Sequence, residues 1–110
     1  MTITEKQVGP ITVLAVSGKL NSDVAGQLKS RVTGLLEAGK TQIVLNLAEL
    51  SYMDSSGLGE MVSCHTTASR KGAVKLANLG KKTTDLLVMT KLIMVFDVYN
   101  SEQEAIASFG

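Results

Sequence analysis

The stretch that decides the fold runs from Ile43 to Gly59 and reads IVLNLAELSYMDSSGLG. It opens with a short apolar run that only Asn46 interrupts, and it lacks the strict alternation of a half-exposed strand. Such a run is typical of a strand buried on both faces of a sheet. A buried helix has a similar composition, but the shortness of the run and its β-branched start favour a strand.

A helix is expected directly after this strand. Its apolar residues are spaced 3, 1, 3 and 3 positions apart, which places them on one face of an α-helix. They are Leu58, Met61, Val62, His65 and Ala68. Gly57 and Gly59 are poor helix formers. We expect them to reduce side-chain bulk and to leave room for another protein surface.

Three polar residues, Asp54, Ser55 and Ser56, lie between the strand and the helix. Their side chains can accept hydrogen bonds from the free N–H groups of the first helical turn. Loops of this kind lie at the carboxyl edge of an α/β sheet, and a helix N-terminus also favours a phosphate. Two interpretations remain open from the residues alone. Either these residues only cap the helix, which is the commoner case, or a serine accepts a phosphoryl group.

The composition narrows the class of protein. The chain has 110 residues, a formal net charge of +1 and 4% aromatic residues without tryptophan. This is the size of one domain, and neither its charge nor its aromatic content favours nucleic-acid binding. The single cysteine, Cys64, cannot form an internal disulfide and is expected to act as a small hydrophobic residue. We expect no secretory signal, membrane span, metal site or cofactor, and a cytoplasmic location.

Strands and helices alternate along the rest of the chain. We expect strands at 3–8 and 11–16 around a Gly9-Pro10 turn, followed by a loop at 18–21. A helix capped by Asn21 or Ser22 should follow, with Asp23 in its first turn and Gly39 beyond its end. The later elements are expected to be a strand at 74–79, a short helix capped by Thr83 or Thr84, a strand at 92–98 and a helix capped by Ser101.

The element order is therefore β-β-α-β-α-β-α-β-α. It predicts a single α/β domain with a mixed sheet of four or five strands and about four helices. Met61, Met89 and Met94 fall on apolar faces and are expected to fill the core.

In these residues and this order the chain resembles a STAS domain, which sulfate transporters and anti-sigma factor antagonists share. The similarity is strongest over LNLAELSYMDSSGLG, and Ser17-Gly18, Lys71-Gly72 and the ending LIMVFDVYNSEQEAIASF support it. It covers nearly the whole chain, so one STAS domain is expected over residues 1–110. The free-standing bacterial antagonists are the most similar members.

The resemblance implies a partner-switching protein that has no enzymatic activity of its own. In such antagonists the anti-sigma factor is a serine kinase with the ATPase fold of gyrase and histidine kinases. It phosphorylates the serine after the motif aspartate, here Ser55, which abolishes binding until a metal-dependent serine phosphatase restores it. The implied partner-binding residues are Asn21, Asp23, Asp54, Ser55, Ser56, Gly57 and Leu58. Ser56 is expected to cap the helix and not to be the main phosphoryl acceptor. Lys19 and Asn21 replace the acidic residues that are usual in the second loop, and Asp23 can replace some of that acidity.

The same residues are compatible with other functions. Asp54, a serine and His65 are the residue types of a hydrolytic triad. However, His65 lies on the apolar face at least nine positions from either serine. This favours a packed core histidine. Neither G-x-S-x-G nor a complete phosphate-binding loop is present. The remaining alternative is a constitutive STAS scaffold, in a stress-signalling complex or a lipid-transport system, in which Ser55 is never modified.

Overall fold

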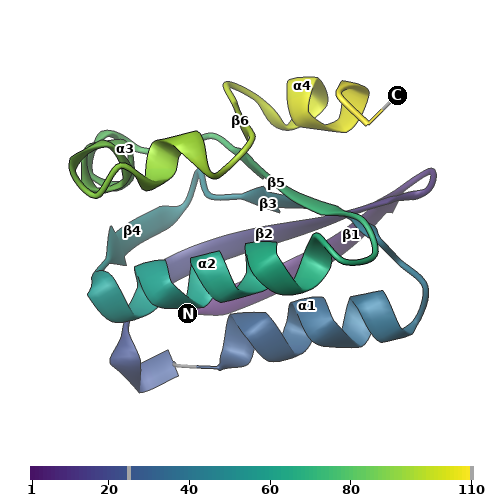
Figure 1. The fold of residues 1–110 in the computed structure, drawn as a ribbon, viewed down its shortest axis with the longest axis horizontal. Helices are drawn as coiled ribbons and strands as arrows, with labels where there is room; N and C mark the ends of the chain where they lie inside the picture. Colours follow the sequence, from purple (N-terminus) through teal and green to yellow (C-terminus); the bar gives the residue numbers. More distant parts are fainter. Residues whose placement is uncertain (25, 110) are drawn as a thin grey trace.

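The computed structural model of the chain describes residues 1–24 and 26–109. The strands are β1 (Thr2–Val8), β2 (Ile11–Leu20), β3 (Gln42–Asn46), β4 (Leu50–Met53), β5 (Ala73–Ala77) and β6 (Val98–Tyr99). The helices are α1 (Gln27–Glu37), α2 (Ser55–Ala68), α3 (Lys81–Met89) and α4 (Glu102–Ala107), with short 3-10 helices η1 (Ser22–Val24) and η2 (Leu92–Met94). Figure 1 shows their arrangement.

One mixed sheet forms the centre of the molecule. Its order is β1-β2-β3-β5-β6, and β4 pairs with β2 outside this path. β1 and β2 form an antiparallel hairpin, whereas every other pairing is parallel. The predicted α/β class and mixed sheet are confirmed. The sheet has six strands instead of the expected four or five, and the additional strand is β4, for which no element was predicted.

The central strand β3 is buried on both faces, as predicted. Ile43, Val44 and Leu45 are all fully buried. Ile43 and Leu45 belong to the larger core cluster, and Val44 belongs to a separate cluster on the opposite face. Their alternation follows from the pleat of a strand, because successive side chains point to opposite faces.

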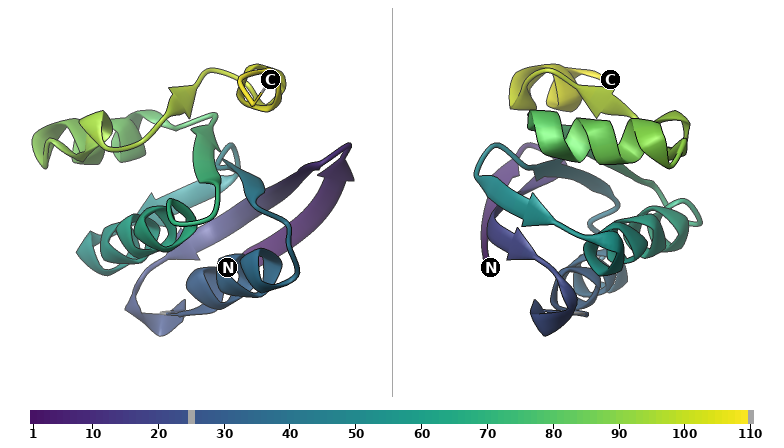
Figure 2. Two further views of the ribbon diagram at one scale, coloured as in Figure 1. Left: turned by 45° about the vertical axis from the view of Figure 1, so that its right-hand side comes forward. Right: turned by 90° about the vertical axis from the view of Figure 1, so that its left-hand side faces the viewer.

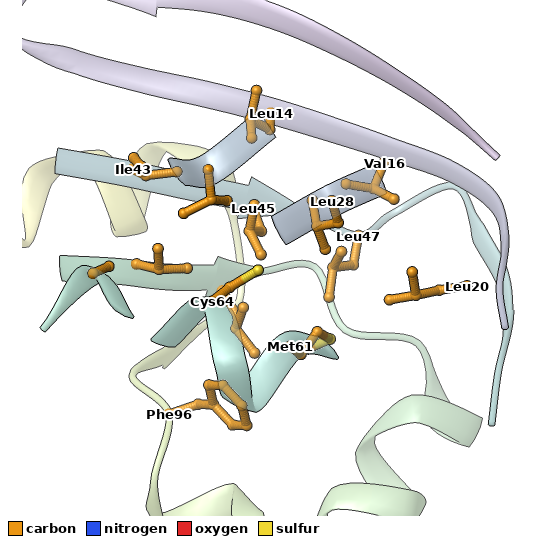
Figure 3. Packing of buried hydrophobic residues seen from close by; sticks show 14 of the residues in the cluster. Leu14, Val16, Leu20, Leu28, Ile43, Leu45, Leu47, Met61, Cys64 and Phe96 are labelled. Carbon is orange, nitrogen blue, oxygen red and sulfur yellow. The ribbon is translucent and has the colours of Figure 1, made fainter. Parts of the chain in front are cut away.

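Helices cover the two faces of the sheet unequally. α1 and α2 lie side by side over one face, and α4 lies on the other (Figures 1 and 2). The larger cluster includes Leu14, Leu28, Met61 and Cys64 (Figure 3). Because α1 and α2 cover this face, the start of α2 is held against the sheet.

The predicted loop at 18–21 is wrong, because β2 continues through Leu20. β4 supplies the pairing partner, with Gly18 opposite Leu50, Lys19 opposite Tyr52 and Leu20 opposite Met53. The register shifts between Gly18 and Lys19, where the strand carries a bulge. Gly18 has a φ of +89°, a conformation that favours glycine.

The predicted start of the first helix is also wrong. Asn21 accepts a hydrogen bond from the Asp23 N–H at 3.1 Å, but this closes only the separate η1 turn. Gly26 is left-handed, with a φ of +86°, so a continuous helix cannot pass through it. α1 therefore begins at Gln27. The predicted stop is confirmed, since left-handed Gly39 (φ +83°) follows the helix.

Residues 81–99 differ most from expectation. α3 begins at Lys81 after Gly80, so the predicted cap at Thr83 or Thr84 is wrong. The Thr84 hydroxyl instead donates to the Gly80 carbonyl from inside the helix, at 2.9 Å. The expected strand at 92–98 is replaced by η2, and only Val98 and Tyr99 pair with β5. The predicted cap of α4 is confirmed, because Ser101 Oγ accepts from the Glu104 N–H at 3.1 Å.

The three methionines that were predicted to fill the core separate into two groups. Met61 is 1% exposed and its predicted core position is confirmed. Met89 and Met94 are 78% and 87% exposed, so their predicted core positions are wrong. The physical reason is that the chain from α3 to η2 turns its other apolar residues, such as Leu87, toward the core.

Candidate functional site

The polar residues after β4 form a capped helix start at the carboxyl end of a parallel strand. Asp54 is the N-cap, with extended backbone angles, and its carboxylate accepts a hydrogen bond from the Gly57 N–H at 3.0 Å. Its backbone carbonyl accepts from the Leu58 N–H at 2.9 Å. The prediction that Ser56 caps this helix is therefore wrong, because Ser56 already lies within the first turn.

Ser55 and Ser56 occupy the first two helical positions and are exposed. Asp54 supplies the cap, so neither hydroxyl is needed for it. The N–H groups at these positions have no acceptor within the helix, and this end of the helix carries partial positive charge. Both serines are thus open to modification, at a place that favours an added negative charge.

Gly57 is a packing residue. It is buried, and a Cβ added to it would lie 2.2 Å from the backbone oxygen of Leu20. The expectation that Gly57 leaves room for another protein is wrong, because β2 fills that space. Leu58 is only 6% exposed. The predicted partner contacts of Gly57 and Leu58 do not fit their placement in the interior.

The η1 turn lies at the same end of the molecule as the start of α2. Leu20, the last residue of β2, accepts a backbone hydrogen bond from Asp54 and leads directly into η1. The Gly26 N–H also donates to the carboxylate of Glu60 on α2. Asp23 is exposed and Asn21 is half-buried. The structure therefore places the η1 turn, with Asn21 and Asp23, at the same end of the molecule as the start of α2, as Figure 2 (right) shows.

A pocket beside this site was not predicted from the sequence. A pocket of about 320 Å³ lies between β4 (Leu50–Met53) and the start of α3, from Gly80 to Thr83. Tyr52, two positions before Asp54, is 48% exposed. Alternation within LSYM was the one available signal for this short strand, and a four-residue run is weak evidence on its own.

A family model described as the STAS domain matches residues 2–105. The chain belongs to the STAS domain family. The anti-sigma-B factor antagonist of Bacillus subtilis is 30% identical to it over 84 residues, which cover 76% of each chain. The predicted family is thereby confirmed.

Solved structures show the same fold. Protein TM1081 from Thermotoga maritima superposes with a TM-score of 0.89 at 26% identity, over 96% of this chain and 92% of its own. The unphosphorylated form of the anti-sigma factor antagonist SpoIIAA superposes with a TM-score of 0.74 at 23% identity, over 98% and 97%. At that identity SpoIIAA supports the fold alone.

Two chemically reactive side chains of this STAS domain lie on α2 away from Ser55. His65 packs against Phe96, with ring centroids 5.4 Å apart. It stands ten positions beyond Ser55, which is about 15 Å along a helix, so the two cannot share a proton directly. Burial, with a smaller contribution from Glu60, raises the pKa of the Cys64 thiol to about 12. The thiolate that a nucleophile requires is therefore negligible near neutral pH.

Within residues 1–24 and 26–109, no group of three His, Cys, Asp or Glu side chains could hold a metal ion. None of the helices in this part of the chain combines the length and the apolar character needed to cross a bilayer.

Proposed function

We propose that this STAS domain is an anti-sigma factor antagonist, that its partner is an anti-sigma factor serine kinase, and that phosphorylation of Ser55 prevents binding. The observation that carries the proposal is an exposed hydroxyl at the first position of α2, directly after the capping Asp54. The antagonist that it resembles in Bacillus subtilis supports the assignment. SpoIIAA, a structural neighbour, has been solved in both unphosphorylated and phosphorylated forms.

Charge explains how the modification acts. A phosphoserine carries about −1.5 to −2 charges at pH 7. On Ser55 this charge is next in sequence to the Asp54 carboxylate, and a docked partner has to desolvate both. A loss of about 2.8 kcal/mol of binding free energy weakens affinity a hundredfold. The helix N-terminus stabilises the phosphate, so the modified domain stays folded.

The neighbouring residues have different roles in this proposal. Asp54 holds the start of α2 and adds negative charge to its surface. Ser56 contacts the partner but is not the main acceptor. Asn21 and Asp23 extend the contact onto η1. Gly57 and Leu58 do not contact the partner in this proposal. They belong to the site because they support the two serines from within the fold.

The domain performs no chemistry of its own in this cycle. The partner kinase uses Mg-ATP, and a metal-dependent serine phosphatase removes the phosphate. The constitutive scaffold uses the same surface but leaves Ser55 unmodified. The two functions therefore differ in one measurable property, which is the phosphorylation state of Ser55.

The test starts from tagged protein purified from its native host during growth and after stress. Phosphopeptide mass spectrometry is expected to find phosphate on Ser55 that changes between the conditions, and the copurified kinase is then identified and expressed. With that kinase and Mg-ATP, Ser55→Ala should abolish phosphorylation, whereas Ser56→Ala, which keeps the acceptor hydroxyl, should still be phosphorylated on Ser55. By calorimetry, Ser55→Asp should bind about a hundredfold more weakly than wild type.

Two results would contradict the proposal. An unmodified Ser55 under every condition favours the constitutive scaffold. Equal binding of the purified kinase by wild type, Ser55→Ala and Ser55→Asp shows that this serine does not control the complex.

A further inference from the structure

Glu60 on α2 makes a long-range contact that the proposed function does not use. Its carboxylate accepts a hydrogen bond from the N–H of Gly26, which lies 34 positions earlier in the chain. The side chain is half-buried, and its second oxygen, Oε2, is buried without a hydrogen bond among the described residues. α1 and α2 pack side by side (Figure 1). The contact therefore ties the second turn of α2 to the residue just before α1.

The Glu60 carboxylate takes the place of a local cap at the start of α1. Gly26 precedes this helix in a left-handed conformation and has no side chain with which to cap it, and the first turn of the helix contains no acidic residue. A negative charge is favourable near a helix N-terminus, because the free N–H groups give this end a partial positive charge. Glu60 supplies that charge from the neighbouring helix, which offsets part of the cost of burying it.

The η1 turn is held to the start of α2 on both of its sides. Before the turn, the Leu20 carbonyl accepts a hydrogen bond from the Asp54 N–H at 3.4 Å. After the turn, the Gly26 N–H donates to Glu60. Residues 21–24, which carry the polar side chains of the proposed partner surface, lie between these two contacts. The two contacts therefore set where this part of the surface stands relative to α2.

The contact before η1 and the contact after it have different origins. At Leu20 two backbone groups meet, in continuation of the pairing of β2 with β4. At Gly26 the acceptor is a side chain. Val24 of η1 also packs against the main core cluster, but an apolar contact has no preferred direction. Among the described residues, Glu60 is the side chain that gives this end of the turn a directional bond to α2.

We infer that Glu60 is a positioning residue of the partner site, which holds the η1 turn beside Ser55 through its bond to Gly26. This inference rests on the proposed function. The anti-sigma factor kinase that binds both parts of the surface then meets η1 in a fixed place, and no binding free energy is lost in ordering the turn. Glu60 acts through the turn and contacts neither the kinase nor the phosphate.

The first test measures binding of the purified kinase to the full chain by calorimetry. Glu60→Ala should weaken binding about fivefold to tenfold, because the η1 turn must then be ordered in the complex. Glu60→Gln should bind within about twofold of wild type, because its amide oxygen still accepts from the Gly26 N–H. The matched control is Glu37→Ala, for which wild-type affinity is expected. Glu37 is exposed at the end of α1, away from η1.

Two further measurements examine the turn and the reaction separately. By NMR hydrogen exchange, the Gly26 amide should exchange about tenfold faster in Glu60→Ala than in wild type, because it has lost its acceptor. Glu60→Gln should keep most of the protection. In the kinase reaction, Glu60→Ala should raise KM for this protein about fivefold to tenfold and leave kcat within about twofold, because the acceptor Ser55 is intact.

A second substitution distinguishes positioning from a general loss of stability. Gly34 lies within α1, and a Cβ on it meets no atom within 4 Å. Gly34→Ala should therefore stabilise the domain through helix propensity. The double variant Glu60→Ala/Gly34→Ala should regain most of the thermal midpoint that Glu60→Ala loses, but none of the lost affinity for the kinase.

The outcomes distinguish the inference from the proposed function. If Ser55→Asp weakens binding but Glu60→Ala binds as wild type does, the inference is overturned and the proposed function stands. If Glu60→Gln loses as much affinity as Glu60→Ala, the charge of Glu60 and not its bond to Gly26 is what matters, and the positioning role is overturned. Affinity that returns together with stability in the double variant overturns it as well. If wild type binds no purified kinase, both proposals fall.

Discussion

The β4–α2 junction and the α3–η2 segment lie at one end of the domain but are built differently. The junction has a side-chain cap, from Asp54, and a close backbone contact between Gly57 and Leu20. The residue before α3 is Gly80 and the residue before η2 is Lys91, and neither makes a side-chain hydrogen bond that caps its helix. The first region is held tightly on the sheet and offers polar groups, whereas the second is held on one side and offers apolar groups.

The largest expected effect tests whether the methionines of the two regions differ as their exposure indicates. Met61→Ala should lower the free energy of unfolding by about 2–5 kcal/mol, because it opens a cavity in the core. Met89→Ala should change it by less than about 0.5 kcal/mol, as is usual for exposed positions. Urea unfolding measures both. A loss above about 2 kcal/mol for Met89→Ala would show that the Met89 side chain is packed within the domain.

The next effect compares two glycines of α2. Gly57→Ala should lower stability by about 1–3 kcal/mol, because the new methyl group meets the backbone of Leu20 and one of the two elements must shift. Gly59→Ala meets no atom within 4 Å and should raise stability by about 0.8–1 kcal/mol through helix propensity. Thermal or urea unfolding of the pair gives the sign of each change. A stable Gly57→Ala variant would disprove the close contact.

A smaller effect is expected from removing the side-chain cap of α2. Asp54→Ala removes the acceptor for the Gly57 N–H and should cost about 1 kcal/mol of stability. Asp54→Asn keeps a side-chain oxygen and is the control, with most of the stability retained. Chemical denaturation compares the two. Equal losses in both variants would mean that charge, and not the hydrogen bond, provides the stabilisation.

The smallest effect is expected from a substitution that adds the side-chain cap that α3 lacks. Gly80 has extended angles (φ −74°, ψ 167°), and a Cβ on it meets no atom within 4 Å. Gly80→Asp should raise stability by about 0.3–1 kcal/mol, through a cap and a charge at the helix N-terminus. Gly80→Ala, which cannot cap, should show no such gain. Differential scanning calorimetry measures the unfolding midpoint of each variant. Identical midpoints for Gly80→Asp and Gly80→Ala would show that a side-chain cap at this position adds no stability.

Much of the β4–α2 junction was predictable because its signals are local. The apolar run of β3, the periodic face of α2 and the cap-type residues between them all lie within residues 43–68. The carboxyl-edge position of Ser55 followed from the strand-loop-helix order. The capping residue itself was misassigned, because Asp54, Ser55 and Ser56 are all suitable types and only the backbone angles distinguish them.

The α3–η2 segment was predicted poorly because its pattern is ambiguous. LIMVFDV is apolar enough for a strand, but only Val98 and Tyr99 find a pairing edge, on β5. Leu92–Met94 instead forms η2 after left-handed Lys91 (φ +63°). The segment is apolar on two sides, and a sequence does not show which side meets the core.

By itself the sequence determined the α/β class, the buried central strand, the stop at Gly39, the cap at Ser101 and the family. These follow from periodicity and short-range hydrogen bonds, which act between residues a few positions apart. Only the tertiary structure decided the pairing of β4 with β2, the break between η1 and α1, the role of Gly57 against Leu20 and the exposure of Met89 and Met94. Each of these depends on residues distant in the chain, because strand edges, close contacts and burial exist only once the elements have packed together.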